Sequence, residues 1–133
     1  MGEELLQKAF AAALAARENA HAPYSRFKVG AAFVLNDGSV VAGCNVENSS
    51  FGATICAERN ALCAAVAKSG MVNAQSLVLI TDIVASPCGI CLQVISDFCK
   101  GDLPIYLSTP KGLGKAKLLR EFLPLPFGPE QLK

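Results

Sequence analysis

The sequence predicts an α/β fold: a three-layer α/β/α sandwich around a mixed, mostly parallel sheet of five strands. Segments with apolar residues at helical spacing alternate with short apolar segments typical of strands, and this order favours parallel strands covered by helices on both faces. The turn sequence Asn36-Asp37-Gly38 adds an early antiparallel hairpin. At 133 residues the chain is expected to form a single domain over residues 1–133.

The first elements are a helix and the hairpin. Leu6, Phe10 and Leu14 follow one another at helical spacing within residues 3–20, and Pro23 marks the end of that helix. The hairpin strands are expected on either side of the turn, over residues 27–35 and 39–46.

The next elements are a helix and a buried strand. Residues 54–69 predict a helix that Gly70 can end, because glycine readily adopts the conformation found just past a helix terminus. The run SLVLIT at 76–81 is typical of a strand covered on both faces.

The last part of the chain leaves one element open. Pro87 precedes a helix expected over 88–98, and residues 105–108 form another buried strand. Residues 115–119 fit either a fifth strand or the start of a last helix.

The composition narrows the class of protein. Apolar residues make up 52% of the chain and charged residues 17%, which excludes a disordered chain. Because the chain is this apolar for a small domain, we expect part of its surface to be buried against other subunits. No apolar run is long enough to span a bilayer, and the N-terminus is acidic where a signal peptide would be basic, so we expect a cytoplasmic protein that does not bind membranes.

The net charge of +1 gives no electrostatic reason to expect nucleic-acid binding. The basic residues near the C-terminus are interpreted as a solvated face; they are Lys111, Lys115, Lys117 and Arg120.

Cysteine spacing indicates a metal site. Cys88 and Cys91 both fall in the first turn of one predicted helix, and Cys56 lies near the start of another. If the two helices begin side by side on one face of the sheet, three thiolates converge, which suits tetrahedral Zn²⁺. Three protein ligands would leave a fourth position open, as in a catalytic site. Glu58, two residues after Cys56, belongs to this group.

Two other interpretations of the cysteines stay open. Cys88 and Cys91 have the spacing of a thiol–disulfide pair, which would need neither Cys56 nor Glu58. A structural zinc site would need a fourth thiolate; the remaining cysteines, which we expect to be small core residues, are Cys44, Cys63 and Cys99. The lone His21 is expected at the surface.

With these residues assembled, the chain resembles a cytidine deaminase of the small, homotetrameric type with three cysteine ligands. The resemblance rests on Cys56-Ala57-Glu58 and Pro87-Cys88-Gly89-Ile90-Cys91, a zinc-deaminase motif in which a non-ligand glutamate follows the first ligand by two. It extends to YSRFKVGAA at 24–32, NVEN at 45–48 and FLPLPFGP at 122–129, and so covers almost the full chain.

The resemblance implies the chemistry. Cys56, Cys88 and Cys91 would bind one Zn²⁺ per subunit, which activates a water for attack on C4 of cytosine. Glu58 would act as the proton shuttle. Arg59, in the family's CAER sequence, would place a cation against the sulfurs. The expected reaction converts cytidine and 2′-deoxycytidine to uridine and 2′-deoxyuridine with release of ammonia, as in pyrimidine salvage.

The resemblance also implies the substrate contacts. Phe27 would pack against the base, Asn45 and Glu47 would bind the ribose, chiefly its 3′-hydroxyl, and Ala57 would contact the substrate. Phe127 would reach into the site of a neighbouring subunit, so that active sites are shared within a homotetramer.

Two residues depart from the family pattern. Leu92 stands where the family usually has arginine, so a cation beside the thiolates is expected to be missing unless Lys28 or another subunit supplies one. We therefore expect Leu92→Arg to change zinc affinity or the pH optimum. Phe51 stands where relatives often have tyrosine near the subunit contact.

Other functions remain alternatives at this point. They are deamination of a modified nucleoside or of a nucleoside-like antibiotic such as blasticidin S, a non-catalytic zinc-stabilised protein that binds nucleosides, and the thiol–disulfide protein.

Overall fold

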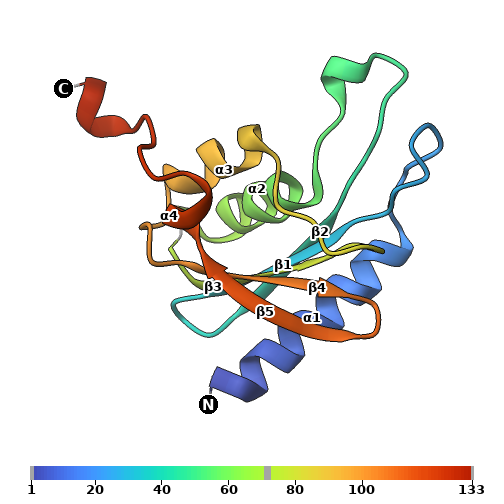
Figure 1. The fold of residues 1–133 in the computed structure, drawn as a ribbon, viewed down its shortest axis with the longest axis horizontal. Coiled ribbons are helices and arrows are strands. Elements are labelled where there is room, and N and C mark those ends of the chain that lie inside the picture. The colour runs from blue at the N-terminus through green and yellow to red at the C-terminus, as the bar shows by residue number, and fades with distance from the viewer. Residues whose placement is uncertain (1, 71–72, 133) are drawn as a thin grey trace.

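The computed structural model describes residues 2–70 and 73–132 and shows one sheet between helices (Figure 1). Its helices are α1 (Gly2–Glu18), α2 (Ala57–Ser69), α3 (Gly89–Ser96) and α4 (Leu119–Phe122), and short 3₁₀ turns cover Phe51–Ala53 and Pro129–Leu132. Its strands are β1 (Gly30–Leu35), β2 (Val40–Cys44), β3 (Ala74–Ile80), β4 (Pro104–Thr109) and β5 (Gly112–Leu118). Five strands therefore form the sheet, as predicted.

The strand order is β2-β1-β3-β4-β5, and it corrects one expectation. Among the neighbouring strands described, β3 and β4 are parallel, whereas β1–β2, β1–β3 and β4–β5 are antiparallel, so the sheet is mixed but not mostly parallel. Helix α2 joins β2 to β3, and α3 joins β3 to β4; these three strands run in the same direction. However, β1 lies between β2 and β3, so the strands joined by α2 are not neighbours.

The two faces of the sheet are covered by different helices (Figure 1). Buried residues alternate along the central strands, because successive side chains of a strand point to opposite faces. The core between the sheet and α1 is formed by Ala9 and Ala13 of the helix and Ala32, Val34, Val78 and Ile80 of the strands. The core on the other face includes Ala61 and Leu62 of α2, Ile95 of α3, and Phe33, Leu77, Leu79 and Ile105 of the strands. In the described part of the chain, no helix combines the length and the apolar character that crossing a membrane requires.

Both α2 and α3 begin at the edge of the sheet where β2 and β3 end. The chain leaves β2 at Cys44 and enters α2 at Ala57, and it leaves β3 at Ile80 and enters α3 at Gly89. In open α/β sheets this edge, beyond the carboxyl ends of the strands, is the usual place for a binding crevice.

Gly43 on β2 allows α2 to pack close to the sheet. A Cβ on Gly43 would lie 2.6 Å from the backbone nitrogen of Ala61 and 3.0 Å from the carbonyl oxygen of Ala57. Both are backbone atoms of α2, so the start of this helix rests directly on β2.

Several boundaries differ from the prediction. The first hairpin strand begins at Gly30 rather than at residue 27, and the helices expected from 54 and 88 begin at Ala57 and Gly89. The open segment 115–119 divides between the end of β5 and the first residue of α4.

Candidate active site

Three thiols meet where α2 and α3 begin. Cys56 and Cys88 are the N-cap residues of the two helices, and Cys91 lies in the first turn of α3. Their three Sγ atoms lie within 4.8 Å of one another, and those of Cys56 and Cys88 are 3.6 Å apart. The convergence predicted from the spacing is therefore present.

The thiol cluster fits Zn²⁺. Tetrahedral zinc with sulfur at about 2.3 Å separates its sulfurs by about 3.8 Å, close to the distance between Cys56 and Cys88. Within the described residues, the group of His, Cys, Asp and Glu side chains able to hold a metal consists of these three cysteines. Three ligands leave the fourth tetrahedral position open.

The electrostatics of the cluster favour a cation. The pKa of Cys56 is lowered to about 5, first by the hydrogen bond from the Cys91 thiol and then by Arg59 and Cys88, against the effect of burial. The pKa of Cys91 is raised, because its thiol donates to Cys56 and because it is buried. Ionised Cys56 thus opposes the ionisation of Cys91, and a divalent cation would allow all three thiols to ionise.

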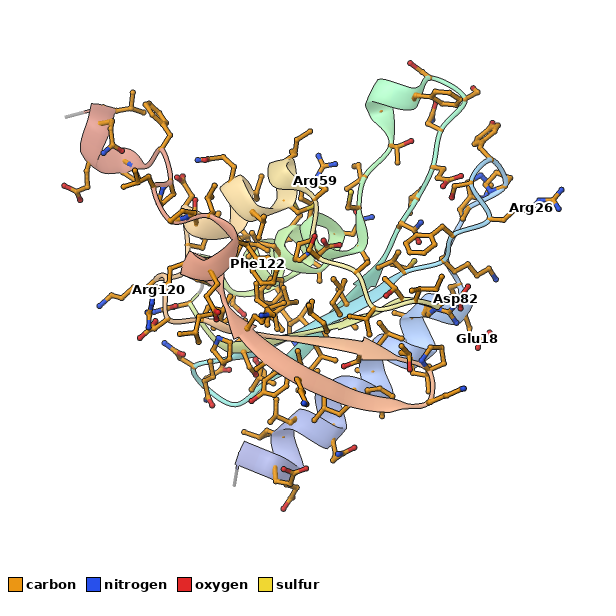
Figure 2. All side chains as sticks on the ribbon, in the orientation of Figure 1. Glu18, Arg26, Arg59, Asp82, Arg120 and Phe122 are labelled. Carbon is orange, nitrogen blue, oxygen red and sulfur yellow. The ribbon has the colours of Figure 1, made fainter. Side chains whose placement is uncertain are left out.

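Arg59 places a cation against the thiols. Its Nη2 is 3.8 Å from Cys56 Sγ and donates to the carbonyl oxygen of Thr54 at 3.3 Å. Its Nε is buried and has no hydrogen-bond partner among the described residues. Arg59 is a residue of α2, and Figure 2 shows it close to α3 as well.

Glu58 is buried beside the thiols. Only 4% of the residue is exposed, and its pKa is raised to about 7, chiefly by burial and further by the charge at Cys56. A carboxyl group with a pKa near neutrality can both accept and donate a proton at physiological pH.

A cavity of about 270 Å³ lies in front of Glu58. It is lined by Ser25, Phe27, Val29, Asn45, Glu47, Thr54, Cys56, Ala57, Glu58, Leu79, Thr81, Ala85, Ser86 and Cys88. This lining contains no lysine, arginine or histidine. Of the predicted substrate contacts it includes Phe27, Asn45, Glu47 and Ala57.

Asn45 holds one wall of the cavity. Its Oδ1 accepts from the backbone N–H of Val29 at 2.9 Å, and its Nδ2 donates to the carbonyl oxygen of Phe27 at 2.8 Å. Residues 27–29 thus lie beside the end of β2, and this orients Phe27. One hydrogen of the Asn45 amide group remains for a further acceptor.

Glu47 holds the loop before that wall. Its Oε1 accepts from the backbone N–H groups of Tyr24 and Ser25, and its Oε2 accepts from the Ser25 hydroxyl. These bonds, the Ser25 hydroxyl first, lower the pKa of Glu47, so its carboxylate stays charged at neutral pH.

Several residues that line the cavity were not predicted from the sequence. The polar ones are Ser25, Thr54, Thr81 and Ser86. The signal available for Ser86 was its place directly before Pro87-Cys88, and that for Ser25 was the YSRF segment. Thr54 and Thr81 had no such signal, since they reach the cavity only through the fold.

Phe127 does not line this cavity. The residue is 55% exposed, and its carbonyl oxygen accepts a hydrogen bond from Gln93 on α3. The structure therefore keeps it apart from the other predicted substrate contacts.

Leu92 is 6% exposed and packs with Leu62 and Ile95 in the core under α2 and α3. The expectation about the remaining cysteines is corrected in part. Cys63 is exposed on α2 rather than buried, whereas Cys99 is buried as expected and Cys44 is half-buried.

Comparison with known proteins agrees with this site. Residues 3–107 match the family described as "Cytidine and deoxycytidylate deaminase zinc-binding region". The chain is 42% identical over 129 residues to the cytidine deaminase of Sporosarcina psychrophila, a match that covers 96% of this chain and 94% of the relative. It is 43% identical over 121 residues to that of Halalkalibacterium halodurans, covering 90% and 92%.

The fold is also that of solved cytidine deaminases. The crystal structure of the enzyme from Burkholderia pseudomallei matches with a TM-score of 0.82 and 41% identity, over 91% of this chain and 98% of the other. The enzyme from Mycobacterium tuberculosis matches with a TM-score of 0.77 and 38% identity, over 92% and 97%. Because the matches in sequence and in fold extend over almost its whole length, the chain belongs to the cytidine deaminase family.

Proposed function

We propose that this protein, as a single catalytic domain over residues 1–133, hydrolyses cytidine and 2′-deoxycytidine to uridine and 2′-deoxyuridine with release of ammonia. The observation that supports this most strongly is the buried Glu58, with its pKa near 7, beside a three-thiol cluster and at a cavity lined by Phe27, Asn45 and Glu47. The relatives named above are cytidine deaminases.

Cys56, Cys88 and Cys91 would hold one Zn²⁺. When bound, the metal acts as a Lewis acid and makes water a nucleophile at neutral pH. Arg59 lies against Cys56 and offsets part of the negative charge that three thiolates bring.

Glu58 would move two protons. It takes the first from the attacking water and delivers it to N3 of the base. It takes the second from the new hydroxyl at C4 and delivers it to the departing amino group. Cytidine and water thus give uridine and ammonia, and Glu58 ends in its starting state.

The cavity lining supplies contacts for a nucleoside. Phe27 offers an apolar face for the base, and Ala57, as the first residue of α2, has a backbone N–H without a helical acceptor that can donate to the base carbonyl. The remaining amide hydrogen of Asn45 and the one remaining lone pair of Glu47 match a ribose hydroxyl. The charged Glu47 and the absence of cationic side chains from the lining disfavour a substrate with phosphates.

We further propose assembly into a homotetramer that shares active sites, with Phe127 entering the site of a neighbouring subunit. Exposed large apolar side chains support this; they include Tyr24, Phe51, Ile83, Val84, Ile90, Leu125 and Phe127. The six cysteines form no disulfides, which fits a role in the reducing cytoplasm, in pyrimidine salvage.

The test is conversion of cytidine to uridine by the purified, zinc-loaded protein. Glu58→Gln, at matched zinc content, is expected to lower kcat by about a thousandfold, because amide nitrogen and oxygen cannot shuttle a proton. Removal of zinc by a chelator should abolish turnover in the parent, whereas a thiol–disulfide protein would keep its activity.

The contrary outcome is equally informative. If the zinc-loaded, assembled parent does not convert cytidine, the proposed substrate is wrong. A panel of modified nucleosides and blasticidin S would then be tested in place of cytidine.

A further inference from the structure

The side chain of Arg17, near the end of α1, contacts two segments that are far apart in the sequence. Its Nε donates to the carbonyl oxygen of Lys28 at 3.1 Å, and its Nη2 forms an ion pair with the carboxylate of Asp82. The Arg17 side chain is only 13% exposed. Figure 2 shows Asp82 beside Glu18, the last residue of α1.

These two segments form walls of the candidate active site. Lys28 stands between Phe27 and Val29, and both of these line the cavity. Asp82 follows Thr81 in the loop that supplies further lining residues, Ala85 and Ser86, before it reaches Cys88. Arg17 itself does not line the cavity.

Arg17 makes its contacts just beyond the last backbone pair between β1 and β3, the strands that lead into these two walls. Strands β1 and β3 pair from Leu35 and Ala74 to Gly30 and Ile80, where both strands meet the cavity edge. Lys28 and Asp82 each lie two residues past this last pair. Arg17 bridges them there, where the ladder of backbone hydrogen bonds has ended.

The close approach of α1 makes this bridge possible. A Cβ on Gly30 would lie 2.1 Å from the carbonyl oxygen of Ala13 and 2.8 Å from Cβ of Arg17. Only a residue without a side chain fits under α1 at this point, and its presence brings Arg17 within reach of both segments.

Each wall also has an anchor of its own. Asn45 bonds the backbone of Phe27 and Val29, and the Thr81 hydroxyl donates to the carbonyl oxygen of Ile83. These anchors shape each wall separately, whereas Arg17 sets one wall relative to the other.

We propose that Arg17, through Asp82 and the Lys28 carbonyl, is a positioning residue that sets the spacing of the two cavity walls and hence the fit of the substrate. The inference rests on the proposed function for the identity of that substrate. The Asp82 side chain is 58% exposed, so the ion pair adds little to global stability. The ion pair instead affects the local geometry of the cavity.

The test uses the zinc-loaded, assembled protein and the variants Arg17→Met, Asp82→Asn and their combination. Arg120→Met is the matched control, since Arg120 lies on α4, well away from Asp82 (Figure 2). One readout is amide hydrogen exchange over residues 27–29 and 82–86. The other is the separation of KM from kcat for cytidine.

Arg17→Met is expected to speed exchange in both segments and to raise KM about fivefold, with kcat changed by less than about twofold. Asp82→Asn should have a smaller effect, because the Lys28 contact remains. The double variant should be no worse than Arg17→Met, since the two residues act through one contact. Arg120→Met should match the parent.

Unchanged hydrogen exchange and unchanged KM in Arg17→Met would overturn the inference, and so would additive effects in the double variant. A third contrary result is a parallel fall in kcat, in substrate affinity and in thermal stability, because this indicates a merely structural role. If the parent does not deaminate cytidine, the proposed function fails, and hydrogen exchange alone still decides whether Arg17 joins the walls.

Discussion

At the scale of single residues, Glu58 shows a conflict between function and stability. Burial and the neighbouring thiolate raise its pKa from 4.5 to about 7, so the folded protein binds its proton more tightly than the unfolded chain does. Ionisation therefore destabilises the fold. This cost is absent below about pH 4.5, grows between the two pKa values and is complete above about pH 7.

Glu58→Gln removes that cost, because glutamine has no charge to bury. We expect the variant to be more stable than the parent by about 1 to 3 kcal/mol at pH 8, with a smaller difference at pH 5. Urea unfolding of both proteins without zinc, at both pH values, measures this. A stability difference that is the same at pH 5 and pH 8 would contradict the assigned environment of Glu58.

Residue types and their spacing predicted the metal-binding cysteines, but not the hydrogen bonds that hold the cavity walls in place. The meeting of Cys56, Cys88 and Cys91 followed from two helix starts, a local signal. The bonds from Asn45 and Glu47 to the backbone of residues 24–29 are tertiary, and neither segment shows them by itself. For the same reason, the sequence did not show that Leu92 turns into the core.

At the scale of elements, the position of α2 depends on the bare backbone of β2 at Gly43. An added methyl group would meet backbone atoms of α2 at 2.6 to 3.0 Å, and backbone cannot yield as a flexible side chain can. Gly43→Ala must therefore push the start of α2, with Cys56 and Glu58, away from the sheet.

We expect Gly43→Ala to lower the free energy of unfolding by about 1 to 3 kcal/mol and to lower both zinc content and kcat/KM. The control is Gly112→Ala at the start of β5, where a Cβ has no neighbour within 4 Å. Urea unfolding, metal analysis and steady-state kinetics compare the two variants. Equal behaviour of the two would show that α2 does not depend on this contact.

The elements were predictable and their order in the sheet was not. Hydrophobic periodicity and the Asn36-Asp37-Gly38 turn are local, and they placed the helices and strands to within a few residues. The insertion of β1 between β2 and β3 depends on which strand edges pair, and that is decided by contacts across the whole sheet. A strand–helix–strand sequence predicts a common direction, but it does not predict that the strands are neighbours.

At the scale of the whole molecule, the exposed apolar side chains and the isolated Phe127 point to the same interpretation. Phe127 and Leu125 lie on the C-terminal segment, where Phe127 is 55% and Leu125 92% exposed. Gln93 on α3 holds the carbonyl of Phe127, so the segment is anchored while its ring stays exposed. On the proposed assembly, that ring completes the cavity of a neighbouring subunit.

This assembly predicts that two inactive variants restore each other. Phe127→Ala lacks the donated ring and Glu58→Gln lacks the proton shuttle, so each tetramer alone should be nearly inactive. After the two are unfolded together and reassembled in equal amounts with zinc, roughly a quarter of the sites should combine an intact Glu58 with an intact Phe127 from another subunit. Cytidine turnover should rise accordingly, while a mixture that is never unfolded serves as the control. If Phe127 served its own subunit, no mixed site would gain a missing group, and turnover would not exceed the average of the two variants.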